Sequence, residues 1–531
     1  MPIVHCQIKD YIQPFERKLA LRELRALCHS SLLPVDGSEQ TASVFSVEAN
    51  GSTDELRDGL TYWRSVGFAD ESLTLQVRGE ATSLIGTSNG FSAIHGSNGD
   101  RRPVKIPRRR CLRYATHGMH EYRGKFFPQL VRALINIAGV PSDGIVVDPM
   151  CGSGTTLVET RLSGRATYGL DMNPLSVFVT HVKCEALSIP AVSLMNAYGQ
   201  LQSTLEHSRL VGDHHTTLPT ADQDYLERWY AASTLRELDQ VHAAIRMLRT
   251  KPLRRFFSVC LSNVLRSVSW QKNDDLRVRK EVVELDHGHV IRGFLAQAQR
   301  SAATVSAFIA ERGRLKVGGF AVEEADARNA IDELQPIAGR VDAVITSPPY
   351  ATALPYIDTD RLSLIYLGLL SRTDHASRDR LMIGNREIST RAREIYWATY
   401  EARKDWLPAV TRRVIDRIDH LNNRGPAGFR RQNLAALLSK YFFDMREVLL
   451  SIRGLLRSGG DAFLVVGNNR TTASGELIEI RTADHLAAIA ENLHFDVVES
   501  LSMDMLPSRD IFRKNAVPSE RIIRLKAPGG T

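Results

Sequence analysis

Two short motifs in this 531-residue chain place polar groups beside turns that a ligand could approach closely. In the first, DPMCGSGTT, Asp148 ends an apolar run, and Gly152 and Gly154 follow, which let the backbone turn tightly. Thr155 opens the next predicted helix, whose first amides favour an anion. The motif has neither the lysine of a phosphate-binding P-loop nor a complete GxGxxG signature. It therefore predicts a ligand-binding turn of another kind.

The second motif is DAVITSPPY, which runs an apolar, β-prone stretch directly into Ser347, Pro348, Pro349 and Tyr350. Consecutive prolines end a strand, because neither can donate a ladder hydrogen bond. The expected result is a stiff turn at the edge of a strand. It presents a hydroxyl, the carbonyl of Pro348 and an aromatic ring. The alternative is a Pro-Pro loop with a purely structural role.

Two further carboxylates follow predicted strands. Asp171 comes 17 residues after Gly154 and ends the next strand, where an acidic side chain can accept hydrogen bonds from both hydroxyls of a ribose. A helix N-cap is the other interpretation of Asp171. Asp326, in VEEADARNA, could accept a hydrogen bond from an adenine amino group or could cap a surface helix.

The elements that must position these residues alternate between short strands and helices from about residue 117 onward. This alternation predicts an α/β fold with an open, twisted, mostly parallel sheet and helices on both faces. Ligands bind such sheets at the carboxyl ends of the strands, so both turns and Asp171 are expected at one edge. Before this region, PFERKLALRELRALC predicts a helix, and SLTLQVRGEATSLIG alternates like a strand.

Composition and charge limit the class of protein. With 43% hydrophobic and 24% charged residues, the chain has the composition of a globular protein. Because it has no apolar run of about 18 residues and no apolar core at its N-terminus, we expect neither a membrane span nor a signal peptide. The six scattered cysteines, with no CxxC pair, favour a reducing cytoplasm and no metal site.

Basic residues indicate a polyanionic partner. The formal net charge is +8, and residues 101–113 hold seven basic side chains and no acidic one. Two long segments interrupt the strand–helix alternation: residues 190–315 are largely helical, and residues 371–437 are rich in arginine. A solvated charged face is the alternative interpretation of such runs.

The order of the glycine turn, Asp171, Asp326 and TSPPY resembles the amino-methyltransferases that use S-adenosylmethionine. These enzymes methylate exocyclic amines, chiefly in DNA. The resemblance runs from about His117 to Ala527, apart from the two insertions, and it implies a Rossmann-like class I methyltransferase fold. In it, HEYRGKFFPQL is similar to the segment that packs over the methionine end of the cofactor. The cofactor-binding residues that follow are Lys125, Phe126, Asp148, Pro149, Cys151, Gly152, Gly154, Thr155, Asp171 and Asp326.

The resemblance also implies a chemical role for the SPPY turn. The lone pair of a base amine is delocalised into the ring, so the amine is a poor nucleophile. Hydrogen bonds from its two N–H groups to Ser347 Oγ and the Pro348 carbonyl would make the nitrogen more tetrahedral. Pro349 would keep the turn rigid, and Tyr350 would stack on the base, which must leave the duplex. Neither a metal nor a covalent nucleophile is required.

The expected substrate is double-stranded DNA. In this family a serine at the first position of the turn is associated with cytosine N4 and an aspartate more often with adenine N6, so Ser347 favours N4-cytosine. A tRNA guanine-N2 enzyme and an inactive binding protein remain alternatives. A separate restriction or defence protein could act with the chain, and its oligomeric state is open. The phosphate-binding candidates are Arg108, Arg109, Arg110, Arg412 and Arg413.

These interpretations divide the chain into six parts. The divisions are residues 1–115, an N-terminal region of unassigned role that ends in a basic linker; 116–189, the cofactor part of the methyltransferase domain; 190–315, a helical insertion and candidate target reader; 316–370, the part with the catalytic turn; 371–437, a basic helical insertion; and 438–531, the C-terminal part of the methyltransferase domain.

Overall fold

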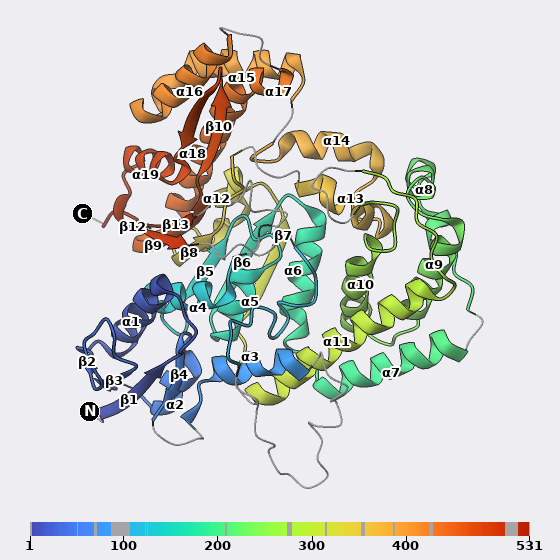
Figure 1. Ribbon diagram of the computed structural model, residues 1–531, viewed down its shortest axis with the longest axis horizontal. Coiled ribbons are helices and arrows are strands. Elements are labelled where there is room, and N and C mark those ends of the chain that lie inside the picture. The colour runs from blue at the N-terminus through green and yellow to red at the C-terminus, as the bar shows by residue number, and fades with distance from the viewer. Residues whose placement is uncertain are drawn as a thin grey trace.

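A seven-stranded sheet forms the centre of the molecule (Figure 1). The computed structural model describes residues 3–49, 51–67, 72–85, 107–122, 124, 126–207, 210–272, 279–313, 316–351, 356–385, 388–423, 428–504 and 519–529. The strand order is β12-β13-β9-β8-β5-β6-β7, and only β13 runs antiparallel to its neighbours. The strands are β5 (Ile145–Asp148), β6 (Ala166–Asp171), β7 (Phe320–Glu324), β8 (Val341–Thr346), β9 (Leu456–Gly467), β12 (Asp496–Asp504) and β13 (Ser519–Lys526).

The sheet has the doubly wound arrangement predicted for a class I methyltransferase. From β5 the chain builds β6 and β7 on one side, and it later adds β8 and β9 on the other side. The strand order therefore reverses between β5 and β8. Such a reversal opens a crevice at the carboxyl ends of the strands, which is where open α/β sheets bind ligands.

Successive strand residues point to opposite faces of the sheet, and both faces are covered by other elements. Val146 and Ile345 face one hydrophobic cluster, which includes α4 (Pro128–Ile137) and the N-terminal region. Val147 and Val344 face the other cluster, which includes α18 (Leu434–Leu455) and α19 (Thr482–Asn492). Strands that are covered on both faces have continuous apolar sequences, which explains why the segments GIVVD and DAVIT could be predicted as strands. Helix α5 (Thr155–Leu162) follows β5 directly.

The N-terminal region forms a small antiparallel sheet of its own, in the order β2-β3-β1-β4. Its elements are β1 (Ile3–Ile8), α1 (Pro14–Cys28), β2 (Leu33–Pro34), β3 (Val44–Glu48), α2 (Thr53–Gly59) and β4 (Trp63–Val66). The helix predicted from PFERKLALRELRALC is confirmed as α1.

The strand-like interpretation of SLTLQVRGEATSLIG is wrong, because Leu75–Ile85 forms helix α3. Thr74 Oγ1 accepts a hydrogen bond from the backbone N–H of Val77 at the start of this helix. A Cβ at Gly79 would lie 2.7 Å from the Phe308 ring, so glycine permits close packing against helix α11 (His289–Arg312). Tertiary packing thus overrides a short alternation of period two.

The described part of the segment 190–315 is largely helical, as predicted. It contains α7 (Ala191–His207), η3 (His214–Thr217), α8 (Thr220–Glu227), α9 (Ala232–Arg246), α10 (Lys251–Leu265) and α11. These helices share one hydrophobic cluster with α6 (Pro174–Ala186), which follows β6, and with α13 (Tyr356–Tyr366), which follows the SPPY turn. The helical segment is therefore packed directly onto the sheet domain.

The second insertion contains the helices α14 (Arg372–Leu381), α15 (Thr390–Arg403), η6 (Lys404–Trp406), α16 (Ala409–Asn423) and α17 (Phe429–Gln432). In Figure 1, α14 lies beside α13, whereas α15–α17 form a lobe at the top together with a hairpin that was not predicted from the sequence. The hairpin pairs β10 (Asn469–Ala473) with β11 (Glu476–Ile480) and contacts α16. Three short helices lie between β7 and β8, namely η4 (Ala327–Asn329), α12 (Ala330–Glu333) and η5 (Gln335–Ile337).

Among the described helices, none is by itself both long and apolar enough to cross a membrane. The bent pair α6 and α7 passes the same length and composition test only when the two are taken together. Seven apolar residues of α6 and α7 are buried in the hydrophobic cluster that these helices share with their neighbours.

Candidate cofactor and catalytic site

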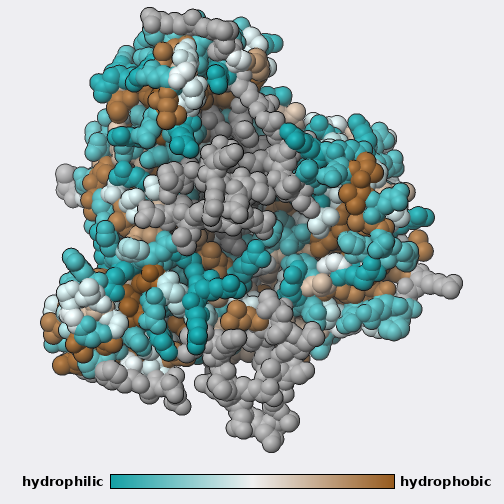
Figure 2. All heavy atoms as spheres, viewed as in Figure 1, coloured by the Kyte–Doolittle hydropathy of each residue, from teal (hydrophilic) through white to brown (hydrophobic). Residues whose placement is uncertain are grey.

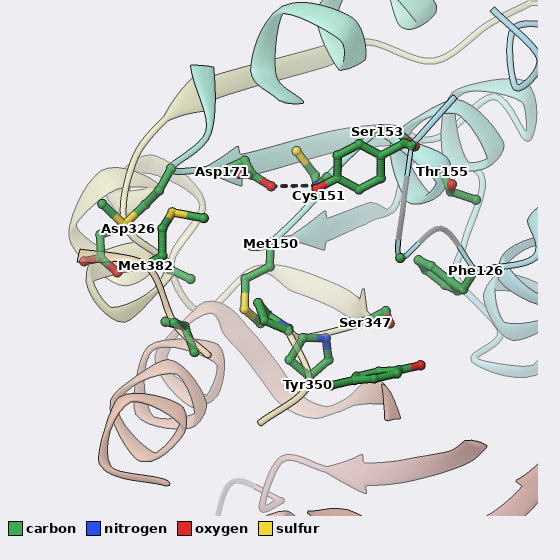
Figure 3. A pocket seen from close by; sticks show the side chains of 18 residues that line it. Phe126, Met150, Cys151, Ser153, Thr155, Asp171, Asp326, Ser347, Tyr350 and Met382 are labelled. Atoms are coloured by element: carbon green, nitrogen blue, oxygen red, sulfur yellow. Dashed lines mark hydrogen bonds between the residues drawn. The ribbon is translucent and has the colours of Figure 1, made fainter. Parts of the chain in front are cut away.

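One cavity joins the glycine turn, Asp171 and the SPPY turn at the carboxyl ends of the central strands. Figure 3 shows Asp326 and Met382 at one end of this cavity and Phe126 and Thr155 at the other. In that view Ser347 and Tyr350 lie across from Asp171 and Cys151. The lining residues are Tyr122, Gly124, Phe126, Met150, Cys151, Gly152, Ser153, Thr155, Asp171, Met172, Asp326, Ala327, Ser347, Pro348, Pro349, Tyr350, Met382 and Ile383.

The glycine turn needs glycine at two positions. Gly152 and Gly154 have φ angles of 50° and 78°, in the left-handed region that glycine adopts readily. A Cβ at Gly152 would lie 3.0 Å from the Tyr122 ring, and one at Gly154 would lie 2.6 Å from Thr180 Cγ2. Thr180 Oγ1 also donates a hydrogen bond of 2.8 Å to the Gly152 carbonyl. The turn is therefore held tightly from two sides.

Asp171 is bonded to the glycine turn rather than to a helix. Its carboxylate accepts hydrogen bonds of 2.8 Å from the backbone N–H groups of Gly152 and Asn173, and the first is the dashed line in Figure 3. The N-cap of α6 is Asn173, whose side chain accepts from the N–H of Leu175, so the cap interpretation of Asp171 is wrong. Burial raises the pKa of Asp171 to about 6, although both N–H donors lower it.

Asp148, Pro149 and Gly154 do not line the cavity. Asp148 lies beneath the turn and is 1% exposed, and its carboxylate accepts a hydrogen bond of 3.2 Å from the Met150 N–H. Burial raises its pKa to about 6. These three residues shape the turn, whereas Cys151, Gly152 and Thr155 line the cavity. Lys125 lies outside the described residues, and Phe126 lines the cavity.

Asp326 both lines the cavity and caps helix η4. Its carboxylate accepts from the Arg328 N–H at 3.0 Å and forms an ion pair with the Arg328 guanidinium. Arg328 also pairs with Asp444 at 2.8 Å and donates to the Leu381 carbonyl at 2.9 Å. Through Arg328, this end of the cavity is connected to α18 and to the end of α14.

The SPPY turn is anchored to the sheet. Ser347 Oγ donates a hydrogen bond of 3.0 Å to the Val465 carbonyl in β9, so its lone pairs stay free to accept hydrogen bonds. Asn469 Nδ2 donates to the Ala351 carbonyl at 2.8 Å, just after the turn. The Tyr350 hydroxyl donates to the Glu520 carboxylate in β13. All four residues of the turn line the cavity.

The five candidate arginines lie away from the cavity, in two groups. In the linker, Arg108 and Arg109 are exposed, but Arg110 forms an ion pair of 3.0 Å with Glu16 and lies 4.5 Å over the Phe127 ring. Arg110 thus ties the linker to α1. The other two, on α16, are Arg413, which is exposed, and Arg412, which pairs with Asp405.

Some residues of the cavity wall were not predicted from the sequence. Met382 and Ile383 come from the end of the α14 region, which the sequence assigned to an insertion. Met172 follows Asp171 directly and could have been inferred from its position. Tyr122 lies within HEYRGKFFPQL, but nothing in that segment pointed to its packing against Gly152. No group of three or more His, Cys, Asp or Glu within the described part of the chain could hold a metal ion.

One family model and several known proteins are similar to parts of this chain. The family model UPF0020, RMKL-like methyltransferase domain, matches residues 119–200, which contain the glycine turn and Asp171. The type II methyltransferase M.MvaI of Kocuria varians is 27% identical over 287 residues, or 51% of this chain and 62% of that protein. M.BsoBI of Geobacillus stearothermophilus is 22% identical, over 72% of this chain and 79% of that protein. A tRNA (guanine(10)-N2)-dimethyltransferase of Methanothermobacter thermautotrophicus is 36% identical over 52 residues, 10% of this chain and 16% of that protein.

The fold, the cavity and these similarities define the class of protein. The chain is related to the S-adenosylmethionine-dependent methyltransferases. Within them it is similar to type II DNA methyltransferases and to a guanine-N2 methyltransferase. The matched region spans less than two thirds of the length of M.MvaI.

Proposed function

We propose that this protein is a DNA methyltransferase that transfers a methyl group from S-adenosylmethionine to the exocyclic amine of a flipped base, with cytosine N4 as the favoured acceptor. The observation that carries the proposal is the shared cavity, in which the glycine turn and Asp171 lie opposite the SPPY turn. A cofactor and a base amine must meet in one enclosed space for this reaction to proceed.

The cavity residues fit an elongated cofactor with a nucleoside at one end. The Asp171 carboxylate is fixed by two backbone N–H groups and can accept ribose hydroxyls. Met172, Met382 and Ile383 offer an apolar surface for an adenine ring, beside the Asp326 carboxylate. Tyr122 and Phe126 would cover the methionine end. When bound, S-adenosylmethionine supplies an electrophilic methyl group.

The SPPY turn is suited to activating an amine. Because the Ser347 hydroxyl already donates to Val465, it meets an incoming N–H group as an acceptor. The Pro348 carbonyl is the second acceptor, and the two prolines hold both in place before the reaction. Two accepted hydrogen bonds would localise the nitrogen lone pair and direct it toward the cofactor side of the cavity.

Ser347 supports cytosine N4 as the acceptor through the family resemblance alone, and adenine N6 remains the second candidate. The similarity to a tRNA (guanine(10)-N2)-dimethyltransferase favours RNA as an alternative substrate. DNA is preferred because the two longer alignments are both to type II methyltransferases. A base inside a duplex must be flipped out to reach such a cavity.

The test is transfer of a tritiated methyl group from S-adenosylmethionine to unmethylated genomic DNA and, in parallel, to unmodified tRNA. We expect labelled DNA, and base-resolved mapping of that DNA should find N4-methylcytosine within one short sequence. N6-methyladenine would move the assignment to the second candidate. Labelled tRNA without labelled DNA would replace the proposal with the RNA alternative, and binding of cofactor with no transfer would refute an enzymatic function.

A further inference from the structure

Tyr350 is held by two residues that lie opposite each other on neighbouring strands. Gly467 ends β9, and Glu520 is its partner in the antiparallel pairing of β13 with β9. A Cβ at Gly467 would lie 2.8 Å from Tyr350 Cε2 and 3.0 Å from Cζ. The ring therefore occupies the space that any other side chain at position 467 would fill.

The other end of the ring is fixed by a hydrogen bond. The Tyr350 hydroxyl donates to the Glu520 carboxylate, which is 8% exposed. Burial raises the pKa of Glu520, and the hydrogen bond from Tyr350 lowers it. A carboxylate buried to this extent is costly to the fold, and its hydrogen-bond partner among the described residues is the Tyr350 hydroxyl.

We infer that Gly467 and Glu520 form a seat that fixes the plane of the Tyr350 ring, so that the ring is ready to stack on the flipped base. This inference rests on the proposed function. The glycine sets how far the ring can lie back against the sheet, and the carboxylate sets its rotation. Glu520 is a positioning residue, because it acts only through Tyr350.

The seat also explains the rigidity of the turn as a whole. Ser347 is bonded to β9 at Val465, and Tyr350 is bonded to β13 at Glu520. On the other side, a Cβ at Gly384 would lie 3.1 Å from Pro349 Cβ. The acceptor hydroxyl and the stacking ring are therefore positioned by adjacent strands of one sheet.

A double-mutant cycle of Glu520→Ala and Tyr350→Phe tests the seat. We expect each single variant to lower kcat/KM for methyl transfer to DNA roughly tenfold, as expected for one oriented hydrogen bond. The double variant should be no worse than either single variant, because both remove the same bond. Glu520→Gln, which keeps an acceptor, should recover most of the activity, and Gly467→Ala should lower it by displacing the ring.

Arg521→Ala is the matched control, because Arg521 is the next residue of β13 and bonds to Ser500 instead. Affinity for S-adenosylhomocysteine and thermal stability are measured for every variant, and we expect the affinity to be unchanged. Wild-type activity in Glu520→Ala would contradict the seat but not the proposed function. The same holds if the losses of kcat/KM in the two single variants multiply in the double variant. A wild-type protein that methylates neither DNA nor tRNA would overturn the proposed function and the seat together.

Discussion

At the scale of single residues, two buried carboxylates under the glycine turn lower the stability of the fold at neutral pH. The pKa values of Asp148 and Asp171 are about 6 in the folded protein, whereas an unfolded aspartate titrates near 4. Between these values the folded state binds more protons than the unfolded state. The free energy of unfolding therefore falls as pH rises from about 4 to about 6. We therefore expect Asp171 to lower the stability of the fold at neutral pH while it serves the proposed ribose binding.

Asp171→Asn separates these two effects. We expect the variant to be more stable at pH 7 and to bind S-adenosylhomocysteine about 1.5–3 kcal/mol more weakly, because a charged acceptor is lost. In the wild type, affinity should rise between pH 5 and pH 7 as Asp171 ionises. Calorimetric titration and thermal unfolding measure both quantities, with the exposed Asp332→Asn as control. An affinity that does not change with pH or with the substitution would contradict the ribose role.

Ser347→Ala tests the amine acceptor. The turn should persist, because Asn469 still bonds to Ala351, but one of the two proposed acceptors is gone. We expect kcat to fall roughly 100-fold, as for loss of one preorganised group at a reacting centre. Cofactor affinity should stay within about twofold. Ser458→Ala, exposed near the other end of β9, is the control. Loss of cofactor affinity with kcat intact would remove Ser347 from catalysis.

Residues in contiguous motifs could be predicted, and residues that depend on tertiary packing could not. Gly152, Asp171 and Ser347 each follow a buried strand, so their place at the sheet edge follows from the fold class. Met382 reaches the same cavity only because α14 folds back over β7. Glu520 lies in an ordinary strand, SERIIRLK, and only its pairing with Gly467 reveals its contact with Tyr350.

At the scale of elements, α14 closes one end of the cavity. Arg378 in α14 donates to the Met172 carbonyl at 2.8 Å and to Glu324 at 2.5 Å, which ties the helix to the ends of β6 and β7. The Met382 carbonyl accepts a hydrogen bond of 3.4 Å from Lys440 of α18. The α14 region belongs to the insertion by sequence but to the cofactor site by position.

Arg378→Ala should loosen this wall. We expect affinity for S-adenosylhomocysteine to fall roughly threefold to tenfold, because partly exposed ion pairs and hydrogen bonds contribute about 1 kcal/mol. Arg380→Ala, on the same helix and exposed, is the matched control. Equal affinities for the two variants would show that α14 does not support the cofactor.

The strands of the central sheet could be predicted from the sequence because they are buried on both faces, unlike the strands of the β10–β11 hairpin. Apolar runs such as IVVD and VDAVIT are typical of strands buried on both faces. The β10–β11 hairpin, NRTTA and ELIEI, instead buries only Ala473, Ile478 and Ile480 and has no continuous apolar run, and α3 carries a short alternation that packing overrides. Those elements needed the structure to be recognised.

At the scale of the molecule, two bodies flank the sheet domain. In Figure 1 the lobe of α15–α17 lies at the top and the helices α7–α11 lie at the right, and α8 contacts both α13 and α14. Figure 2 shows that hydrophilic residues cover most of this face on both bodies, and that hydrophobic residues form separate patches. Under the proposed function, the net charge of +8 would favour binding of the polyanionic substrate.

Arg413 on α16 tests the contribution of the lobe to DNA binding. We expect Arg413→Ala to weaken binding to duplex DNA of any sequence and to reduce the slope of log affinity against log salt by about 1. Fluorescence anisotropy over a salt series measures both. Arg25→Ala, in the N-terminal region where Arg25 pairs with Glu39, is the control. An unchanged slope would exclude a phosphate contact by Arg413.

The hydrophobic cluster that joins α7–α11 to α6 and α13 has a consequence for how this protein can diversify. Because those helices share their interior with the elements that follow Asp171 and Tyr350, removing them would expose the sheet domain to water. Under the proposed function, with these helices as the candidate target reader, a new target preference could not be acquired by exchanging a whole module. It would have to arise gradually, through changes on the outer faces of these helices, because their inner faces are packed in the shared hydrophobic cluster.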